Sequence, residues 1–140
     1  MKGLFTYIVL LQALLVPSNS YACDCMQTNI ADRFSNTENI YTAKLSSATV
    51  VEPDNDKDWS YVEGTFQVIE TYKGNQKPIM KLKTGIDFGA CGIPMTVGRA
   101  YLIFQGNNEH INTCGGTTTV NPYDKDELAK RLGTKSTSNK

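Results

Sequence analysis

The pattern of apolar and polar positions separates a leading apolar segment from a longer part of the chain in which short segments alternate. Leu4–Val16 is almost entirely apolar, follows Lys2 and ends at Pro17, and the residues just before Cys23 include small ones at the spacing of a cleavage site. This is the pattern of a cleaved secretory signal, and the apolar run is too short to span a bilayer. We therefore expect residues 1–22 to be removed and the mature protein to be secreted, into the extracellular space or a periplasm.

The sequence leaves two other fates of this segment open. The signal could remain uncleaved as an anchor, or Cys23 could carry a lipid. Lipoprotein signals usually place Leu three residues before the cysteine, whereas this chain has Ser20 there. The difference matters because acylation would remove the free α-amine of Cys23.

Beyond the signal, period-2 alternation and β-branched residues predict five strands separated by turn signals. The predicted strands cover residues 39–51, 59–73, 79–84, 99–105 and 109–114. Gly64, in the middle of the second, predicts a bulge or a sharp bend. Gly106-Asn107-Asn108 predicts a hairpin turn that pairs the fourth strand with the fifth.

Helical spacing appears near both ends of the mature chain. Thr28–Phe34 predicts a short helix capped by its first residues. A second helix is predicted to open at Asn121–Pro122, to bury Leu128 and Leu132 on one face, and to end at Gly133. Five strands and two flanking helices predict a mainly β protein of the small, partly open barrel type that binds oligonucleotides or oligosaccharides.

Length and charge limit the organisation further. Removal of the first 22 of 140 residues leaves 118, which suits one domain over residues 23–133 followed by a polar tail over 134–140. The mature chain carries 13 basic and 14 acidic residues, because only Lys2 among the charged residues lies in the signal. We expect no nucleic-acid partner, no membrane span and a monomer.

Four cysteines in an exported chain predict two disulfides, with three possible pairings. If Cys23 and Cys25 lie in extended chain, their Cα atoms are about 7 Å apart, which exceeds the usual span of a disulfide. Each therefore needs a distant partner, either Cys91 or Cys114. Both remaining pairings close long loops.

Several short motifs in a fixed order carry a resemblance to a known family. They are Cys23-x-Cys25, Phe34 nine residues later, Tyr-Thr-Ala-Lys at 41–44, Tyr-Lys-Gly at 72–74, Ala-Cys-Gly at 90–92, His-Ile-Asn-Thr-Cys at 110–114 and Leu-Ala-Lys-Arg at 128–131. With these motifs the chain resembles the inhibitory domain of the tissue inhibitors of metalloproteinases (TIMPs), within the netrin-like group. The resemblance covers nearly all of residues 23–133.

The resemblance implies a five-stranded, OB-fold-like (netrin-like) β-barrel with the disulfides Cys23–Cys91 and Cys25–Cys114. It departs from the family at Ser35, where a cysteine of a third disulfide would be expected. The separate C-terminal domain of the animal proteins is also missing, so the expectation is a minimal, single-domain version.

The resemblance also implies a mechanism centred on Cys23. Its main-chain amine and carbonyl oxygen would chelate the catalytic zinc of a target metalloprotease and displace the nucleophilic water. An α-amine has a pKa of about 7.7–8.0, so it can bind zinc as the neutral amine near neutral pH. The implied protease-binding residues are Cys23, Asp24, Cys25, Met26, Gln27, Gly89 and Ala90, and the protein would need no cofactor of its own.

Asp24 sets an expectation about the target. In the family the second mature residue enters the specificity pocket beside the zinc, where small or hydroxyl residues suit the matrix enzymes. A carboxylate there would be repelled by the protease's general-base glutamate or would have to take up a proton. This favours a metalloprotease other than the matrix enzymes as target.

Other hypotheses compete with inhibition. The chain could be a non-inhibitory netrin-like module that binds another extracellular partner through the barrel surface, with the disulfides as staples only. A zinc site of Cys23, Cys25, His110 and Cys114 is disfavoured, because export favours disulfides. An enzyme is disfavoured as well, because no nucleophile–base pair or acid–base pair of carboxylates can be placed.

Overall fold

In a computed structural model, the described residues are 23–26, 28–54, 59–86, 89 and 91–133. They form one antiparallel sheet and two helices, so the mainly β expectation is confirmed. The elements are α2 (Ile30–Asn36), β1 (Asn39–Val51), β2 (Tyr61–Lys73), β3 (Ile79–Gly85), β4 (Ala100–Gln105), β5 (Thr118–Val120) and α3 (Lys125–Leu132). The predicted signal at 1–22 and tail at 134–140 lie outside these residues. No helix in the described part of the chain is long and apolar enough to cross a membrane.

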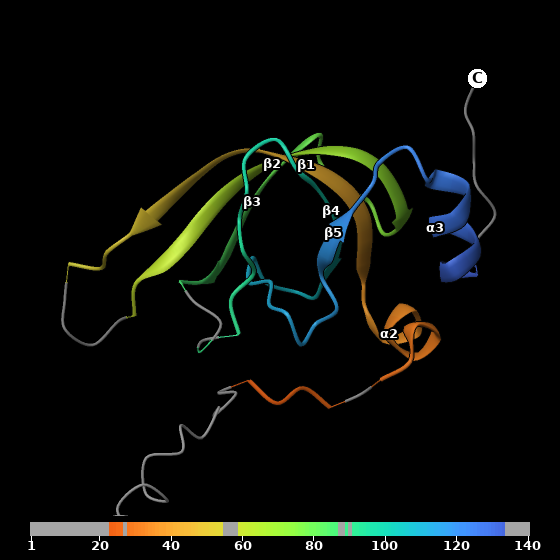
Figure 1. Cartoon of the computed structure of the whole chain (residues 1–140), viewed down its shortest axis with the longest axis horizontal. Coiled ribbons are helices and arrows are strands. Elements are labelled where there is room, and N and C mark those ends of the chain that lie inside the picture. The colour runs from red at the N-terminus through yellow and green to blue at the C-terminus, as the bar shows by residue number, and fades with distance from the viewer. Residues whose placement is uncertain (1–22, 27, 55–58, 87–88, 90, 134–140) are drawn as a thin grey trace, which may run out of the picture.

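The sheet is organised around β1, which is long enough to pair with two neighbours. It pairs with β2 from Ile40 to Val51 and with β4 only from Asn39 to Lys44, giving the strand order β3-β2-β1-β4-β5. The sheet curves strongly (Figure 1), and the far half of β1, from Ser47 to Val51, pairs with the part of β2 that also pairs with β3.

The five strands leave the sheet open, with β3 and β5 at its two edges, so the expected barrel is not confirmed. The only pairing of β3 beyond β2, among the described residues, is an isolated parallel bridge between Lys83 and His110. Lys83 N donates to Glu109 O at 2.8 Å, and Ile111 N donates to Lys83 O at 2.8 Å. The segment after β4 therefore touches the edge of β3 without forming a strand.

The bulge expected at Gly64 is found close to it but in the neighbouring strand, β1. The register shifts between Leu45 and Ser47, where Ser46 is the extra residue. Gly64 serves another purpose, since a Cβ atom there would lie 2.6 Å from the Sδ atom of Met95 and 2.9 Å from Cδ1 of Leu45. The glycine allows the segment before β4 to pack directly on the sheet.

Both faces of β4 are buried, because the strand alternates between two apolar clusters. The inner face of the curved sheet holds Tyr41, Ala43, Leu45, Phe66, Leu82, Tyr101 and Ile103, with Ile93 and Ile111. On the outer face Ile40, Leu102 and Phe104 pack against Leu128 and Leu132 of α3. The helical spacing of these two leucines was read correctly from the sequence.

The last predicted strand is wrong. Residues 109–114 do not pair with β4, and β5 at Thr118–Val120 takes that place. The hairpin prediction failed because main-chain groups of this stretch bond elsewhere. Glu109 and Ile111 bond to Lys83, and Thr113 N donates to Cys91 O at 3.0 Å.

Both predicted helices are present, but each begins later in the chain than predicted. α2 begins at Ile30, capped by Asn29, whose Oδ1 accepts from Asp32 N at 2.8 Å. α3 begins at Lys125 rather than at Asn121–Pro122, because Asn121 forms a separate turn in which its main-chain oxygen accepts from Asp124 N at 3.2 Å. Gly133 ends α3 at φ 69°, as predicted.

Lys73, at the end of β2, fixes the end of α2. Its Nζ donates to the main-chain oxygens of Phe34 at 2.7 Å and Ser35 at 3.0 Å, and lies 5.4 Å from the centre of the Phe34 ring. A cation at a helix C-terminus also complements the helix dipole. The helix end at Ser35 is thus held by hydrogen bonds from Lys73, at the position where the resemblance implied a third disulfide.

Candidate functional site

The segment at residues 23–26 is attached to the body by both disulfides. Cys23 is bonded to Cys91, with Cα atoms 5.5 Å apart, and Cys25 is bonded to Cys114, with Cα atoms 5.1 Å apart. These are the pairs that the resemblance implies. The two bonds lie side by side, since the sulfur of Cys114 is 3.7 Å from that of Cys23 and 3.9 Å from that of Cys91. Two segments far apart in sequence therefore hold residues 23–25 at one place.

Thr113 joins those two segments independently of the disulfides. Its main-chain N donates to Cys91 O at 3.0 Å, and its hydroxyl is 3.2 Å from the same oxygen and 2.9 Å from Gly92 O. Cys91 is the one non-glycine residue with positive φ in the described ranges, at 55°. The left-handed conformation is unfavourable for an L-residue by roughly 1–2 kcal/mol. The contacts from Thr113 help to hold Cys91 in it.

Exposure alternates along the anchored segment. Cys23 and Cys25 are half-buried, whereas Asp24 and Met26 are exposed, Met26 at 87%. Because alternate side chains of an extended chain point to opposite sides, the disulfides hold one side and leave the other to solvent. The free side presents an acid followed by a flexible apolar side chain.

The other predicted contact residues are only partly placed. Gly89 is exposed, and Gln27 and Ala90 lie outside the described residues. Gly89 lies beside a groove of about 790 Å³ whose other lining residues include Trp59, Tyr61, Ile86 and His110. Trp59 is 90% exposed and Ile86 is 50% exposed. This apolar groove was not predicted from the sequence as part of the site.

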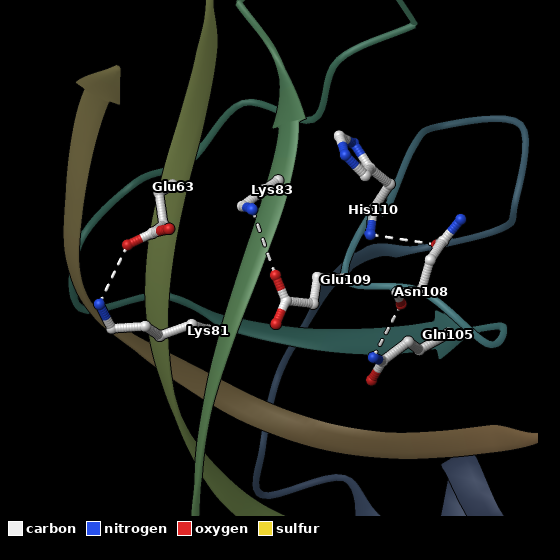
Figure 2. Close-up of polar contacts among 7 residues, drawn as sticks. All are labelled: Glu63, Lys81, Lys83, Gln105, Asn108, Glu109 and His110. Carbon is white, nitrogen blue, oxygen red and sulfur yellow. Dashed lines mark hydrogen bonds and ion pairs between the residues drawn. The ribbon is translucent and has the colours of Figure 1, made fainter. Parts of the chain in front are cut away.

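A polar network positions the segment that follows β4 against β3. The hydroxyl of buried Tyr41 donates to Gln105 Oε1 at 2.6 Å, and Gln105 Nε2 donates to Asn108 O at 3.0 Å. The side chain of Asn108 then accepts from His110 N at 3.1 Å (Figure 2). Burial raises the pKa of Tyr41 well above its usual value, so the phenol stays protonated as the donor.

Charged residues line the outer side of β3 next to this network. Lys83 Nζ is 3.3 Å from a carboxylate oxygen of Glu109, and Lys81 Nζ is 3.1 Å from Glu63 (Figure 2). The hydrogen bond from Lys83 to Glu109, followed by the nearby Tyr61, raises the pKa of Lys83. Lys83 Nζ also lies 5.4 Å from the centre of the Tyr61 ring. Exposed pairs of this kind contribute little to stability.

The sulfurs of Cys23, Cys25 and Cys114 lie within 4.8 Å of one another, a grouping that could suggest a metal site. All four cysteines are, however, in disulfides. A cysteine ligates zinc as the thiolate, and a disulfide sulfur is not available in that form. The grouping of these sulfurs is therefore explained by the two adjacent disulfides.

Sequence reasoning did not single out Thr113, Thr84 or Asn112 as supports of the site. Thr84 Oγ1 accepts from Ile93 N at 2.9 Å, and Asn112 Oδ1 accepts from Gly115 N at 2.7 Å. The Thr84 side chain fixes the main chain just after Cys91, and the Asn112 side chain fixes the turn that contains Cys114. Their roles depend on partners distant in sequence or on a local turn, so residue type alone gave no signal for Thr113 and Thr84.

No model of a known protein family matches the chain, and no curated protein matches its sequence.

Proposed function

We propose that the mature protein begins at Cys23, is secreted, and inhibits a zinc metalloprotease through that terminus. The observation that carries the proposal is the double anchoring of residues 23–25, which holds a would-be chain terminus fixed while Asp24 and Met26 remain exposed. A terminus is normally the most mobile part of a domain. A terminus fixed in advance loses little conformational entropy when it enters an active site.

In this proposal the Cys23 amine and carbonyl oxygen would ligate the protease zinc in place of its water. Cys23 would bind as the neutral amine, and Asp24, Cys25 and Met26 would follow in that order along the protease cleft. Gly89, with Ala90, would form the second contact, and the disulfide from Cys23 to Cys91 brings that loop beside the terminus. The zinc belongs to the target enzyme, so the chain needs no resident metal.

We further propose membership of the TIMP-like, netrin-like group and an OB-type barrel as its architecture. Three features support this: the disulfide pairs, a long first strand that pairs with both β2 and β4, and the parallel contact of residues 109–111 with β3. A parallel contact at that edge is where closure of the sheet would start. Two disulfides also support an oxidising, extracellular or periplasmic location.

The alternative function is a netrin-like binding module that engages a partner through its surface. The groove between Trp59 and Ile86 favours it, because exposed aromatic and aliphatic side chains around a hollow are typical of interaction sites. This function does not depend on the chemistry of the Cys23 amine.

The test is inhibition of a panel of zinc metalloproteases before and after carbamylation of the α-amine. Reaction near pH 7 favours the α-amine, whose pKa of about 7.7–8.0 is well below that of lysine. Loss of inhibition on carbamylation supports zinc chelation by the terminus. Inhibition that survives would place the contact elsewhere on the surface, and no inhibition across the panel would favour the binding module.

A further inference from the structure

A second groove lies on the outer face of the sheet, beside the segment that leads into α3. Its volume is about 590 Å³, and its lining includes Lys44, Ile69, Arg99, Val120, Pro122 and Tyr123. None of these residues is a cysteine or belongs to the anchored terminal segment. The groove is therefore distinct from the site proposed for the protease.

The fold explains why this face is open. Ala43 and Leu45 of β1 point into the inner cluster, so Lys44 between them points outward. α3 covers the outer face of β4 at Leu102 and Phe104. The start of β4 at Ala100 lines the groove instead.

The groove offers apolar surface to solvent. Ile69 is 38% exposed, and Tyr123, on the turn before α3, is 89% exposed. Ile69 is the extra residue of a register shift in β2, between the pairs Thr42–Glu70 and Ala43–Val68. A bulge of this kind redirects a side chain, and here it adds an aliphatic group to the outer face.

Two cations lie together at the same groove. Lys44 pairs in register with Ala100, so Arg99 is one residue away from the position opposite Lys44. Both side chains are exposed, and neither forms an ion pair with a described residue. The groove lining contains no acidic residue among those described.

We propose that this groove binds a small soluble organic anion, with an aromatic or aliphatic body and one carboxylate, sulfonate or phosphate group. The body would lie on Ile69, Val120 and Tyr123, and the acid group would bind between Lys44 and Arg99. An open, mostly apolar hollow with a few convergent polar groups is the usual form of a small-molecule site, and its volume is within the usual range. Charge complementarity selects an anion, since the cations have no acidic partner in the groove.

The experiment uses two fluorescent probes that differ only in the acid group, 8-anilinonaphthalene-1-sulfonate and its neutral analogue N-phenyl-1-naphthylamine. Titration of the full mature protein should show one site for the sulfonate, with the neutral probe bound about ten-fold more weakly, the equivalent of one charge-assisted contact. The variant Lys44→Gln/Arg99→Gln should lose about ten-fold in affinity for the sulfonate and leave the neutral probe unchanged.

Two control variants locate the binding. Lys77→Gln/Lys130→Gln removes two exposed cations away from the groove and should leave both affinities unchanged. Trp59→Ala alters the other groove and should also have no effect. The proposal is overturned if Lys44→Gln/Arg99→Gln binds the sulfonate like the unmodified protein, if both probes bind equally well, or if Trp59→Ala abolishes binding.

Discussion

Thr113 holds the main-chain oxygen of Cys91 from two directions, with its N at 3.0 Å and its hydroxyl at 3.2 Å. The neighbour of Thr113 is Cys114, so this contact lies between the two disulfides that fix residues 23–25. The position of residues 23–25 therefore depends on hydrogen bonds as well as on covalent bonds.

Replacement of Thr113 by Val should weaken the support of Cys91. The change keeps the shape and the main-chain hydrogen bond but removes the hydroxyl, so the free energy of unfolding should fall by about 1 kcal/mol. Urea denaturation of the oxidised protein measures the change. Thr119→Val, at an exposed position of β5, should change stability by much less, and an equal loss in both variants would contradict the role of Thr113.

Replacement of Gly64 by Ala should destabilise the inner core. The added methyl group would meet Met95, Phe66 and Leu45 at 2.6–2.9 Å, and overpacking of this kind costs about 1–3 kcal/mol. Gly106→Ala is a matched control, because nothing lies within 4 Å of a Cβ atom there. Thermal denaturation of both variants measures the difference in stability. A Gly64→Ala protein as stable as Gly106→Ala would show that Met95 and its neighbours move aside at no cost.

Tyr41 should make the protein sensitive to alkali. Burial raises the pKa of Tyr41 in the folded state above its unfolded value of about 10, so its contribution to stability is complete below pH 10 and is lost as the pH rises further. The slope reaches at most about 1.4 kcal/mol per pH unit for one proton. Urea denaturation between pH 8 and pH 11 should show this loss.

Tyr41→Phe is the matched variant for that measurement. At pH 7 it should be about 1–2 kcal/mol less stable, because Gln105 Oε1 loses its donor in a buried place. The difference from the unmodified protein should shrink above pH 10. Parallel stability curves for the two proteins would show that Tyr41 is not the titrating group.

Asp24 should limit inhibition of the matrix metalloproteinases. If its carboxylate faces the general-base glutamate of the protease, Asp24→Thr should strengthen inhibition of such enzymes by ten-fold or more, about one pKa unit of relieved repulsion. Inhibition constants at pH 7 measure the gain. Lys81→Gln, a change on exposed β3 surface, should have no effect, whereas unchanged inhibition by Asp24→Thr would place residue 24 away from the zinc.

The strands were predictable where one face is buried and the pairing is local. β1 was predicted at its observed bounds, and β3 and β4 within one residue, because alternation over these stretches follows the sheet's two faces. The predicted second strand began at Trp59, but β2 starts at Tyr61 and Trp59 is 90% exposed. Trp59 fits the β pattern of the sequence although it lies outside the residues of β2 that pair with other strands.

The segment from Glu109 to Cys114 was not predictable in the same way. Its alternation and the turn before it favour a hairpin, but a distant strand and a disulfide compete for its main chain. The same holds for Thr113, whose role depends on Cys91, 22 residues earlier. Sequence reasoning identified the cysteines of the candidate site, and the groove at Trp59 emerged only from the structure.

The central proposal is that Cys23, as a free terminus, ligates the zinc of a target protease. The most direct measurement compares the inhibition constant of protein that begins at Cys23 with that of protein carrying one additional Ala before it, against the protease inhibited best. The added residue leaves both disulfides in place but converts the amine into an amide, which is a poor zinc ligand. We predict at least about a hundred-fold loss of inhibition, equivalent to about 2.7 kcal/mol. Equal inhibition by the two proteins would contradict the claim.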